Sequence, residues 1–240
     1  MKRTLIGVLT PSSNTVLEPL TSAMLAPLAD VSAHFGRFGV TEISMSAQSQ
    51  AQFERENQLS AAGLLADARV GAIVWSGTSA SWLGFNRDVD LCRAITELTQ
   101  IPAGSSVLAV NELFTHFGVK KFGLVSPYID EIQQGIITNY AAHGLECVAE
   151  RHLGESRNFE FSEFSEELIT QLILEVAESK PDAITVMCTN MRGAKIAPDL
   201  EQQIGIPVID STSAAVWTGL RLAGESPSRV LGWGKIFEIA

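Results

Sequence analysis

Long apolar runs and clusters of basic residues are both missing from this sequence of 240 residues. No apolar stretch approaches the roughly 20 residues that cross a bilayer. Lys and Arg total 17 against 27 Asp and Glu, which gives a formal net charge of −10, and no basic run offers itself to phosphates. These shortages argue against nucleic acid as a partner, against an anionic membrane surface and against insertion into a membrane.

Cysteine is scarce, and the first residues are too polar for a secretory signal. Cys92, Cys147 and Cys188 are odd in number and far apart, which fits neither a disulfide framework nor a zinc site. The apolar run near the N-terminus stops at Leu9, so the h-region of a signal peptide is lacking. We therefore expect a cytoplasmic protein whose thiols stay reduced.

What the sequence does contain is a series of short, continuously apolar segments, as strands buried in a parallel sheet are. The five clearest are Thr4–Leu9, Ala72–Trp75, Phe122–Val125, Ala183–Met187 and Val208–Ile209. Because parallel strands need crossover connections, the sequence between them should supply helices.

Helical patterns do occupy those intervals. Apolar residues recur at three- and four-residue steps from Phe161 to Val176, and a second apolar face runs from Val89 to Ile95. A first helix is expected to begin near Asn14–Thr15, with Pro19 in its opening turn. Strands that alternate with helices predict an α/β fold with parallel sheets and right-handed crossovers.

Three blocks of sequence recur, in the same order, in the two halves of the chain. Ile6–Pro11 resembles Phe122–Pro127, Gly71–Gly77 resembles Asp182–Cys188, and Ile101–Pro102 resembles Ile206–Pro207. The spacing between matching blocks changes by only a few residues from pair to pair, as differences in loop length would produce. We infer two pseudo-symmetric, Rossmann-like α/β halves, 1–117 and 118–211, with the segment 212–240 packing back on the first half.

Polar loops follow the strands of these repeated blocks, at residues 11–14, 77–79, 126–128 and 188–190. Open α/β sheets bind ligands at the carboxyl ends of their strands, beside helix N-termini. These loops offer hydroxyls, amides and backbone N–H groups, and Arg192 is the one cation near a strand end. Such neutral donors suit a carboxylate or an enediolate. Each alone is explained as well by helix capping, but four converging loops favour a site in a cleft between the halves.

Cys188 is the one cysteine at such a strand end, and the repeat places Gly77 at the matching position opposite. A thiol beside a helix N-terminus can have its pKa lowered from about 8.5 and then exchange protons near neutral pH. Cys92 lies on the apolar side of a helical pattern and Cys147 in a predicted strand, so we expect both to be core residues. For Cys188 alone, packing is as good an explanation as catalysis, but its place in the repeat favours catalysis.

These motifs carry a family resemblance over essentially the full length of the chain. Gly7–Asn14, Gly77–Ser81 and the segment around Cys188 resemble the aspartate/glutamate racemase superfamily, and within it most closely maleate cis–trans isomerase and arylmalonate decarboxylase. The pattern of the racemases and the isomerase has two cysteines on opposite faces of the cleft. A glycine at the first position and Cys188 at the second resembles instead the single thiol and dioxyanion hole of arylmalonate decarboxylase.

That resemblance implies a cofactor-independent lyase that decarboxylates aryl- or alkylmalonates. The substrate-binding residues that it implies include Gly77, Thr78, Ser79, Tyr128 and Thr189. Of these, the hydroxyls of Thr78, Ser79 and Tyr128 would bind one carboxylate. The second carboxylate would lie in an apolar pocket, where desolvation favours the loss of carbon dioxide. Cys188 would then protonate the enediolate from one face. No metal or organic cofactor is implied, and no metal-ligand spacing, P-loop or dinucleotide fingerprint occurs.

Two other functions stay open. Asn14 and Asn158 resemble carboxylate-binding asparagines of the isomerase, and on this resemblance the protein would be a maleate isomerase or an Asp/Glu-type racemase. A helix cap explains Asn14 equally well. For Asn158, a solvated side chain in a polar loop is the better explanation. The third is a non-catalytic carboxylate-binding protein, because two α/β lobes around a cleft also describe binding proteins. For each of these functions the expected partner is a small mono- or dicarboxylic acid. A homo-oligomer is compatible with all of them. Val40, Ile43 and Met45 lie in a segment that could cover the binding pocket.

Overall fold

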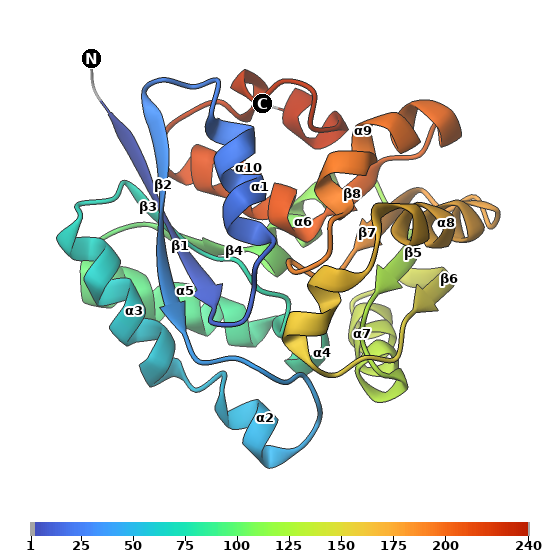
Figure 1. Cartoon of the computed structure of the whole chain (residues 1–240), viewed down its shortest axis with the longest axis horizontal. Coiled ribbons are helices and arrows are strands. Elements are labelled where there is room, and N and C mark those ends of the chain that lie inside the picture. Colours follow the sequence, from blue (N-terminus) through green and yellow to red (C-terminus); the bar gives the residue numbers. More distant parts are fainter. Residues whose placement is uncertain (1–2, 240) are drawn as a thin grey trace.

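The computed structural model describes residues 3–239 and contains two four-stranded parallel sheets with helices around them (Figure 1). The first sheet has the order β2-β1-β3-β4, with β1 Thr4–Pro11, β2 Val31–Phe38, β3 Ala72–Trp75 and β4 Ala103–Ser105. The second has the order β6-β5-β7-β8, with β5 Lys121–Ser126, β6 Glu146–His152, β7 Ala183–Val186 and β8 Val208–Asp210. The predicted α/β fold with parallel sheets is confirmed.

Helices connect the strands in the way that parallel pairing requires. They are α1 Leu17–Leu25, α2 Ala47–Ala51, α3 Arg55–Asp67, α4 Ala80–Leu83, α5 Asn86–Thr99, α6 Ser106–His116, α7 Asp130–Ala142, α8 Glu166–Ala177, α9 Gly193–Ile204 and α10 Ser211–Leu222. Short 3₁₀ turns lie at η1 Asn158–Glu163, η2 Pro227–Arg229 and η3 Lys235–Glu238. Within residues 3–239, no helix is both long and apolar enough to cross a membrane.

The internal repeat is real at the level of strand register. In the first sheet Ile6 of β1 stands beside Ala72 of β3, and in the second the matching residue Phe122 stands beside Ala183. The next pair of strands behaves alike, because Ile73 pairs with Ala103 and Ile184 pairs with Val208. Both sheets also share one strand order. The two halves are therefore the pseudo-symmetric α/β units that the repeated blocks predict.

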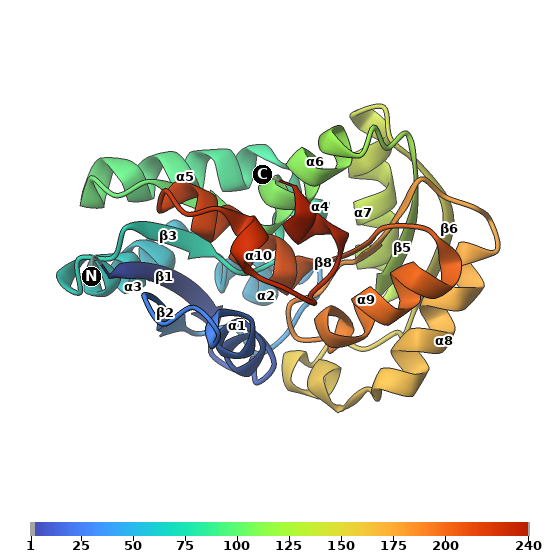
Figure 2. The ribbon, with the colours of Figure 1, turned by 90° about the horizontal axis from the view of Figure 1, so that it is seen from above.

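Helix α10 follows the last strand of the second sheet but packs on the first. It contacts α6, β3, β4 and α1, and Figure 2 shows it between the two sheets. Gly219 lies close over Ile6 of β1 and Val74 of β3. Beyond α10, Arg229 forms ion pairs with Asp30 and with Glu225. We propose on this basis that the halves span 1–117 and 118–211 and that 212–240 completes the first half.

Some predicted elements differ in detail. Strands β2 and β4 were not anticipated; β2 is a half-exposed edge strand and β4 only three residues long, so neither has a continuous apolar run. Val89 was placed on the apolar face of α5, yet it is 46% exposed. The pattern from Phe161 to Val176 is broken in two, because Ser165 caps α8 by accepting a hydrogen bond from the backbone N–H of Leu168.

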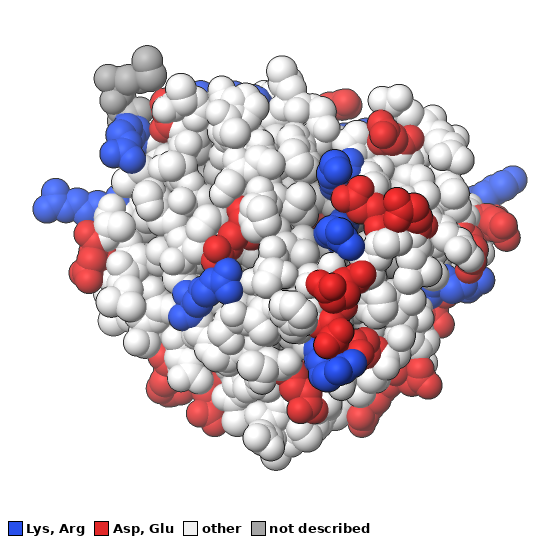
Figure 3. All heavy atoms as spheres, in the orientation of Figure 1, with Lys and Arg blue, Asp and Glu red and all other residues white. Residues whose placement is uncertain are grey.

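Charge is dispersed over the face of the molecule drawn in Figure 3. Acidic and basic side chains lie interspersed there, and no basic patch gathers. Elsewhere in the structure opposite charges also form ion pairs, for example Arg37 with Glu18. On this face the surface lacks the clustered cations on which phosphate binding depends.

Candidate active site

The thiol of Cys188 lies directly after β7 and is buried, with 2% of the residue exposed. Its Sγ accepts a hydrogen bond of 3.4 Å from the backbone N–H of Asn190. Burial raises the pKa of this thiol to about 12, although hydrogen bonds from the Asn190 backbone and the Tyr128 hydroxyl lower it. The expected lowering of the pKa by a helix N-terminus is wrong in this structure, since α9 begins only at Gly193 and desolvation outweighs the nearby donors.

Two hydroxyls from different halves meet beside this thiol. The Thr78 Oγ1 after β3 and the Tyr128 hydroxyl after β5 lie 2.6 Å apart, and both residues are buried. Desolvation raises the pKa of Tyr128 well above its usual range, so this phenol stays a neutral donor. Ser79, which is 6% exposed, precedes α4, and its side chain makes no capping hydrogen bond. Pseudo-symmetry thus brings the predicted hydroxyls of Thr78, Ser79 and Tyr128 together in space.

A small cavity of about 20 Å³ lies among these groups. It is lined by Pro11, Val40, Ile43, Phe53, Trp75, Gly77, Thr78, Ser79, Trp82, Tyr128, Asn158, Cys188 and Thr189. Of the eight site residues predicted from the sequence, only Asn14 is absent from this lining. A volume of this size holds about one water molecule, so a carboxylic acid can enter only if part of the lining moves.

The segment between β2 and α3 covers the cavity. Val40 and Ile43 are buried in its lining as expected, whereas Met45 is 38% exposed and does not line it. The cover is joined to the other half, because Glu42 and Arg157 form an antiparallel bridge and the Ile43 N–H donates to the Ser156 carbonyl oxygen. This segment therefore gives the cavity an apolar wall, and it is held in place by hydrogen bonds to the second half.

Asn158 departs from its expected setting. The sequence favoured a solvated side chain in a polar loop, but Asn158 is 5% exposed, lies in η1 and lines the cavity. Its Nδ2 donates to the Ser13 Oγ at 2.8 Å. The bridge to the covering segment buries this part of the loop, and nothing in the local sequence shows that bridge.

Asn14 is engaged as a cap. Its Oδ1 accepts from the backbone N–H groups of Val16 and Leu17 at the start of α1, and its Nδ2 donates to the Thr189 Oγ1 at 3.2 Å. The Thr189 hydroxyl in turn donates to the Ser76 carbonyl oxygen. Asn14 thus caps α1 through its Oδ1 and holds one strand-end loop against another through its Nδ2.

Gly77 stands opposite Cys188 in the repeat, and its missing side chain is replaced by the indole of Trp75. A Cβ on residue 77 would lie 2.1, 2.4 and 2.5 Å from the Cζ2, Cη2 and Cε2 of Trp75. Only glycine tolerates so close an approach. The sequence predicts the absence of a second thiol, but that an aromatic ring takes its place follows only from the packing of Trp75 against Phe38 and Phe53.

Three aromatic lining residues were missed from sequence: Phe53, Trp75 and Trp82. Trp75 could have been suspected, because it ends a repeated strand block immediately before the polar loop. The ring of Trp82 stacks edge-on with Tyr128 at 5.3 Å, and that of Phe53 with Trp82 at 6.4 Å. Trp82 directly follows the motif Gly77–Ser81, which could have pointed to it, whereas nothing in the sequence near Phe53 marks that residue as part of a site.

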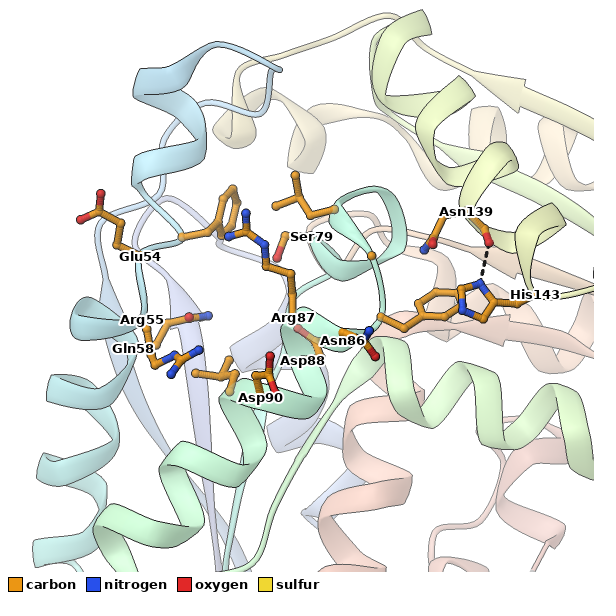
Figure 4. A pocket seen from close by; sticks show the side chains of 15 residues that line it. Glu54, Arg55, Gln58, Ser79, Asn86, Arg87, Asp88, Asp90, Asn139 and His143 are labelled. Atoms are coloured by element: carbon orange, nitrogen blue, oxygen red, sulfur yellow. Dashed lines mark hydrogen bonds between the residues drawn. The ribbon is translucent and has the colours of Figure 1, made fainter.

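A much larger hollow, about 720 Å³, lies next to the cavity (Figure 4). It shares Phe53 and Ser79 with the cavity, and the rest of its lining includes charged residues of both signs, such as Arg55, Arg87 and Asp88. It lacks the thiol and the paired hydroxyls, so the smaller cavity is the better candidate for chemistry. Among residues 3–239, no group of three His, Cys, Asp or Glu side chains is placed to hold a metal ion.

Comparison with known proteins places this architecture in a family. The family model described as arylmalonate decarboxylase matches residues 6–237. Arylmalonate decarboxylase from Bordetella bronchiseptica is 25% identical over 237 residues, covering 97% of this chain and 96% of the relative. Maleate isomerase from Alcaligenes faecalis is 27% identical over 228 residues, covering 91% and 89%.

The fold is shared with solved structures as well. Maleate cis–trans isomerase from Nocardia farcinica, with a covalently bound succinylcysteine intermediate, superposes with a TM-score of 0.89 at 23% identity and covers 98% of both chains. The relatives by sequence are enzymes of two kinds, a decarboxylase and isomerases, that act on small carboxylic acids. With nearly its whole length matched by the family model, this chain belongs to the arylmalonate decarboxylase family.

Proposed function

We propose that this protein is a cofactor-independent decarboxylase of malonate-type acids in which Cys188 is the only proton donor. The observation that carries the proposal is the pair Gly77 and Trp75. Since the indole fills the position where a second thiol would stand, the side of the cavity at Gly77 has no room for one. A two-base racemase and an isomerase with two cysteines are both disfavoured by this arrangement.

The protonation state of Cys188 supports the same reaction. A thiol whose pKa is raised by burial stays protonated near neutral pH, which suits a proton donor and not a resting nucleophile. After it gives up its proton, the buried thiolate is strongly basic and regains a proton from water. The acid form is therefore restored before the next turnover.

The hydroxyls of Thr78, Ser79 and Tyr128 are the proposed donors to one carboxylate. The other carboxylate lies against the apolar wall that includes Val40 and Ile43, where it is poorly solvated. The bond between the α-carbon and this carboxyl carbon breaks, carbon dioxide leaves, and the electron pair forms an enediolate on the retained carboxylate. The donors stabilise that charge, and the Cys188 S–H proton goes to the α-carbon.

The test is a panel of methylmalonate, phenylmalonate, maleate and aspartate followed by proton NMR in deuterated buffer. We expect a malonate to yield a monoacid with one deuterium at the α-carbon. Cys188→Ser should lower this turnover at least about a hundredfold, the usual scale of general acid catalysis. Cys92→Ser is the matched control, because Cys92 is a buried thiol in α5, outside the cavity. Undiminished turnover by Cys188→Ser would contradict the role.

A maleate-type isomerase is the second candidate, and Asn158 is the observation in its favour. Its buried amide lines the cavity, where it could bind a second carboxylate. Fumarate formed from maleate, without carbon dioxide release from any malonate, would establish the isomerase instead. Thermal stabilisation by one of these acids without turnover of any would favour the third function, a non-catalytic carboxylate-binding protein.

A further inference from the structure

Trp75 ends β3 and is 1% exposed, yet it lines the cavity beside Thr78 and Tyr128. Its Nε1–H has no hydrogen-bond partner among the residues that the structure describes. Nε1 is bonded to Cε2, the ring atom that lies 2.5 Å from where a Cβ of residue 77 would stand. The orphaned donor therefore belongs to a side chain that shares the cavity lining with Cys188. Leaving a buried donor unpaired is costly, so its place at a binding cavity needs an explanation.

A buried indole N–H without a partner is not by itself a site. The indole N–H of Trp217 in α10 is also buried without an acceptor within residues 3–239. The Arg221 Cζ lies over the Trp217 ring, 4.4 Å from its centroid. The two tryptophans differ in their surroundings, because Trp217 is outside the cavity. Trp75, in contrast, lines the cavity together with the hydroxyl donors Thr78, Ser79 and Tyr128. In the part of the chain that the structure describes, no Lys, Arg or His lines this cavity.

We propose that Trp75 is a substrate-contacting, specificity-determining residue: its Nε1–H donates to a carboxylate oxygen of the substrate, and its ring limits the substituent on the α-carbon to a small alkyl group. This rests on the proposed function. The size limit follows from the Trp75 ring, which packs on Phe38 at 5.2 Å and takes the volume beside Gly77. On this proposal the acid enters by movement of the covering segment, and the indole, which is borne by β3, keeps its place.

The hydrogen bond is tested by binding rather than by turnover. The probe is methylmalonate, or maleate as a second dicarboxylate, added to protein with ¹⁵N-labelled tryptophan. We expect the Trp75 indole proton to shift downfield on titration while that of Trp217 stays unchanged. Trp75→Phe keeps most of the ring and loses the donor, so it should weaken binding of the probe by about ten- to a hundredfold, the range for a hydrogen bond to a charged group. Trp217→Phe is the matched control and should leave affinity unaltered.

The size limit is tested by the ratio of kcat/KM for phenylmalonate to that for methylmalonate. Trp75→Leu should raise this ratio at least about tenfold, whereas Trp217→Leu should leave it unchanged. If Trp75→Leu does not fold, the milder Trp75→Phe, which also frees some volume, should raise the ratio in the same direction. A ratio unchanged in a folded variant overturns the size limit.

The two proposals fail in different ways. An unshifted Trp75 indole with a probe that demonstrably binds, or full affinity in Trp75→Phe, overturns the assignment of Trp75 even if decarboxylation is found. A shifted indole and weakened binding in Trp75→Phe, with no decarboxylation of any malonate, supports the carboxylate contact and contradicts the proposed reaction alone.

Discussion

Three residues, Cys188, Gly77 and Trp75, shape the chemistry available to this member of the family. Cys188 and Gly77 occupy equivalent ends of equivalent strands, and from symmetry alone a cysteine at residue 77 would create a two-sided site. The indole of Trp75 changes that expectation, because it already fills the space into which such a side chain would project. Of the residues described, the buried Cys188 is the one cysteine in the lining of the cavity.

Gly77→Cys is therefore expected to destabilise the protein rather than simply add a thiol. A Cβ within 2.5 Å of three ring atoms forces Trp75 or its strand to move, and overpacking of a core usually costs about 1–3 kcal/mol. Urea denaturation measures the loss. Gly63→Cys in α3 is the matched control, since no atom lies within 4 Å of a Cβ there, and Trp75→Leu combined with Gly77→Cys should recover part of the loss. A Gly77→Cys protein as stable as the parent would contradict the close contact.

At the scale of elements, each strand-end loop is held by side chains from the other half. The Asn190 Oδ1 after β7 accepts from the backbone N–H groups of Thr15 and Val16 before α1. Thr189 links the same loop to the end of β3. The loops that bear the candidate site are thus mutually braced, which preorganises donors that would otherwise be mobile.

Asn14→Ala is expected to cost about 1 kcal/mol of unfolding free energy, because it removes the acceptor for the Val16 and Leu17 N–H groups at the start of α1. Asn14→Ser should cost less, since serine also caps helices well and only the bond from Nδ2 to Thr189 is lost. Thermal and urea unfolding of the two variants measure the difference. Equal losses in both would show that the cap contributes little.

At the scale of the whole molecule, burial places two carboxyl groups in an unfavourable environment. Asp88 in α5 and Asp210 at the start of α10 are both buried, and desolvation raises the pKa of each to about 7. Asp210 also accepts from the backbone N–H groups of Thr212 and Ser213, which offsets part of the cost. One Asp88 oxygen has no partner within the described part of the chain. Stability should therefore depend on pH.

The free energy of unfolding is expected to fall as the pH rises from about 4 to 7. Since the folded pKa of these carboxyls exceeds the unfolded value of 3.8, the folded state binds more protons in this window. The stabilising contribution is complete below pH 3.8 and is lost as the pH passes 7, by at most about 1.4 kcal/mol per pH unit for each group. Asp88→Asn should flatten the slope measured by urea denaturation. Asp90→Asn, at an exposed ion pair with Arg93 on the same helix, should not. If the free energy of unfolding changed with pH in the same way for Asp88→Asn and for the parent, this account would be contradicted.

Much of the site could be predicted from the sequence, but its conformation could not. The repeated blocks placed Gly77, Thr78, Ser79, Tyr128 and Cys188 at strand ends, and the structure gathers them at one cavity. The setting of Asn158, the aromatic walls and the direction of the Cys188 pKa shift were not predictable, because each depends on contacts with segments far away in the chain.

Local patterns in the sequence predict the α/β class, the duplication and the family resemblance, because apolar periodicity and repeated motifs are local properties of a chain. The same patterns do not predict the edge strand β2, since a half-exposed strand such as Val31–Phe38 has no continuous apolar run. The packing of the folded chain alone shows that the Trp75 indole fills the space beside Gly77 and that burial raises the pKa of the Cys188 thiol. Both depend on packing and desolvation, which arise only when the two halves close around the cavity.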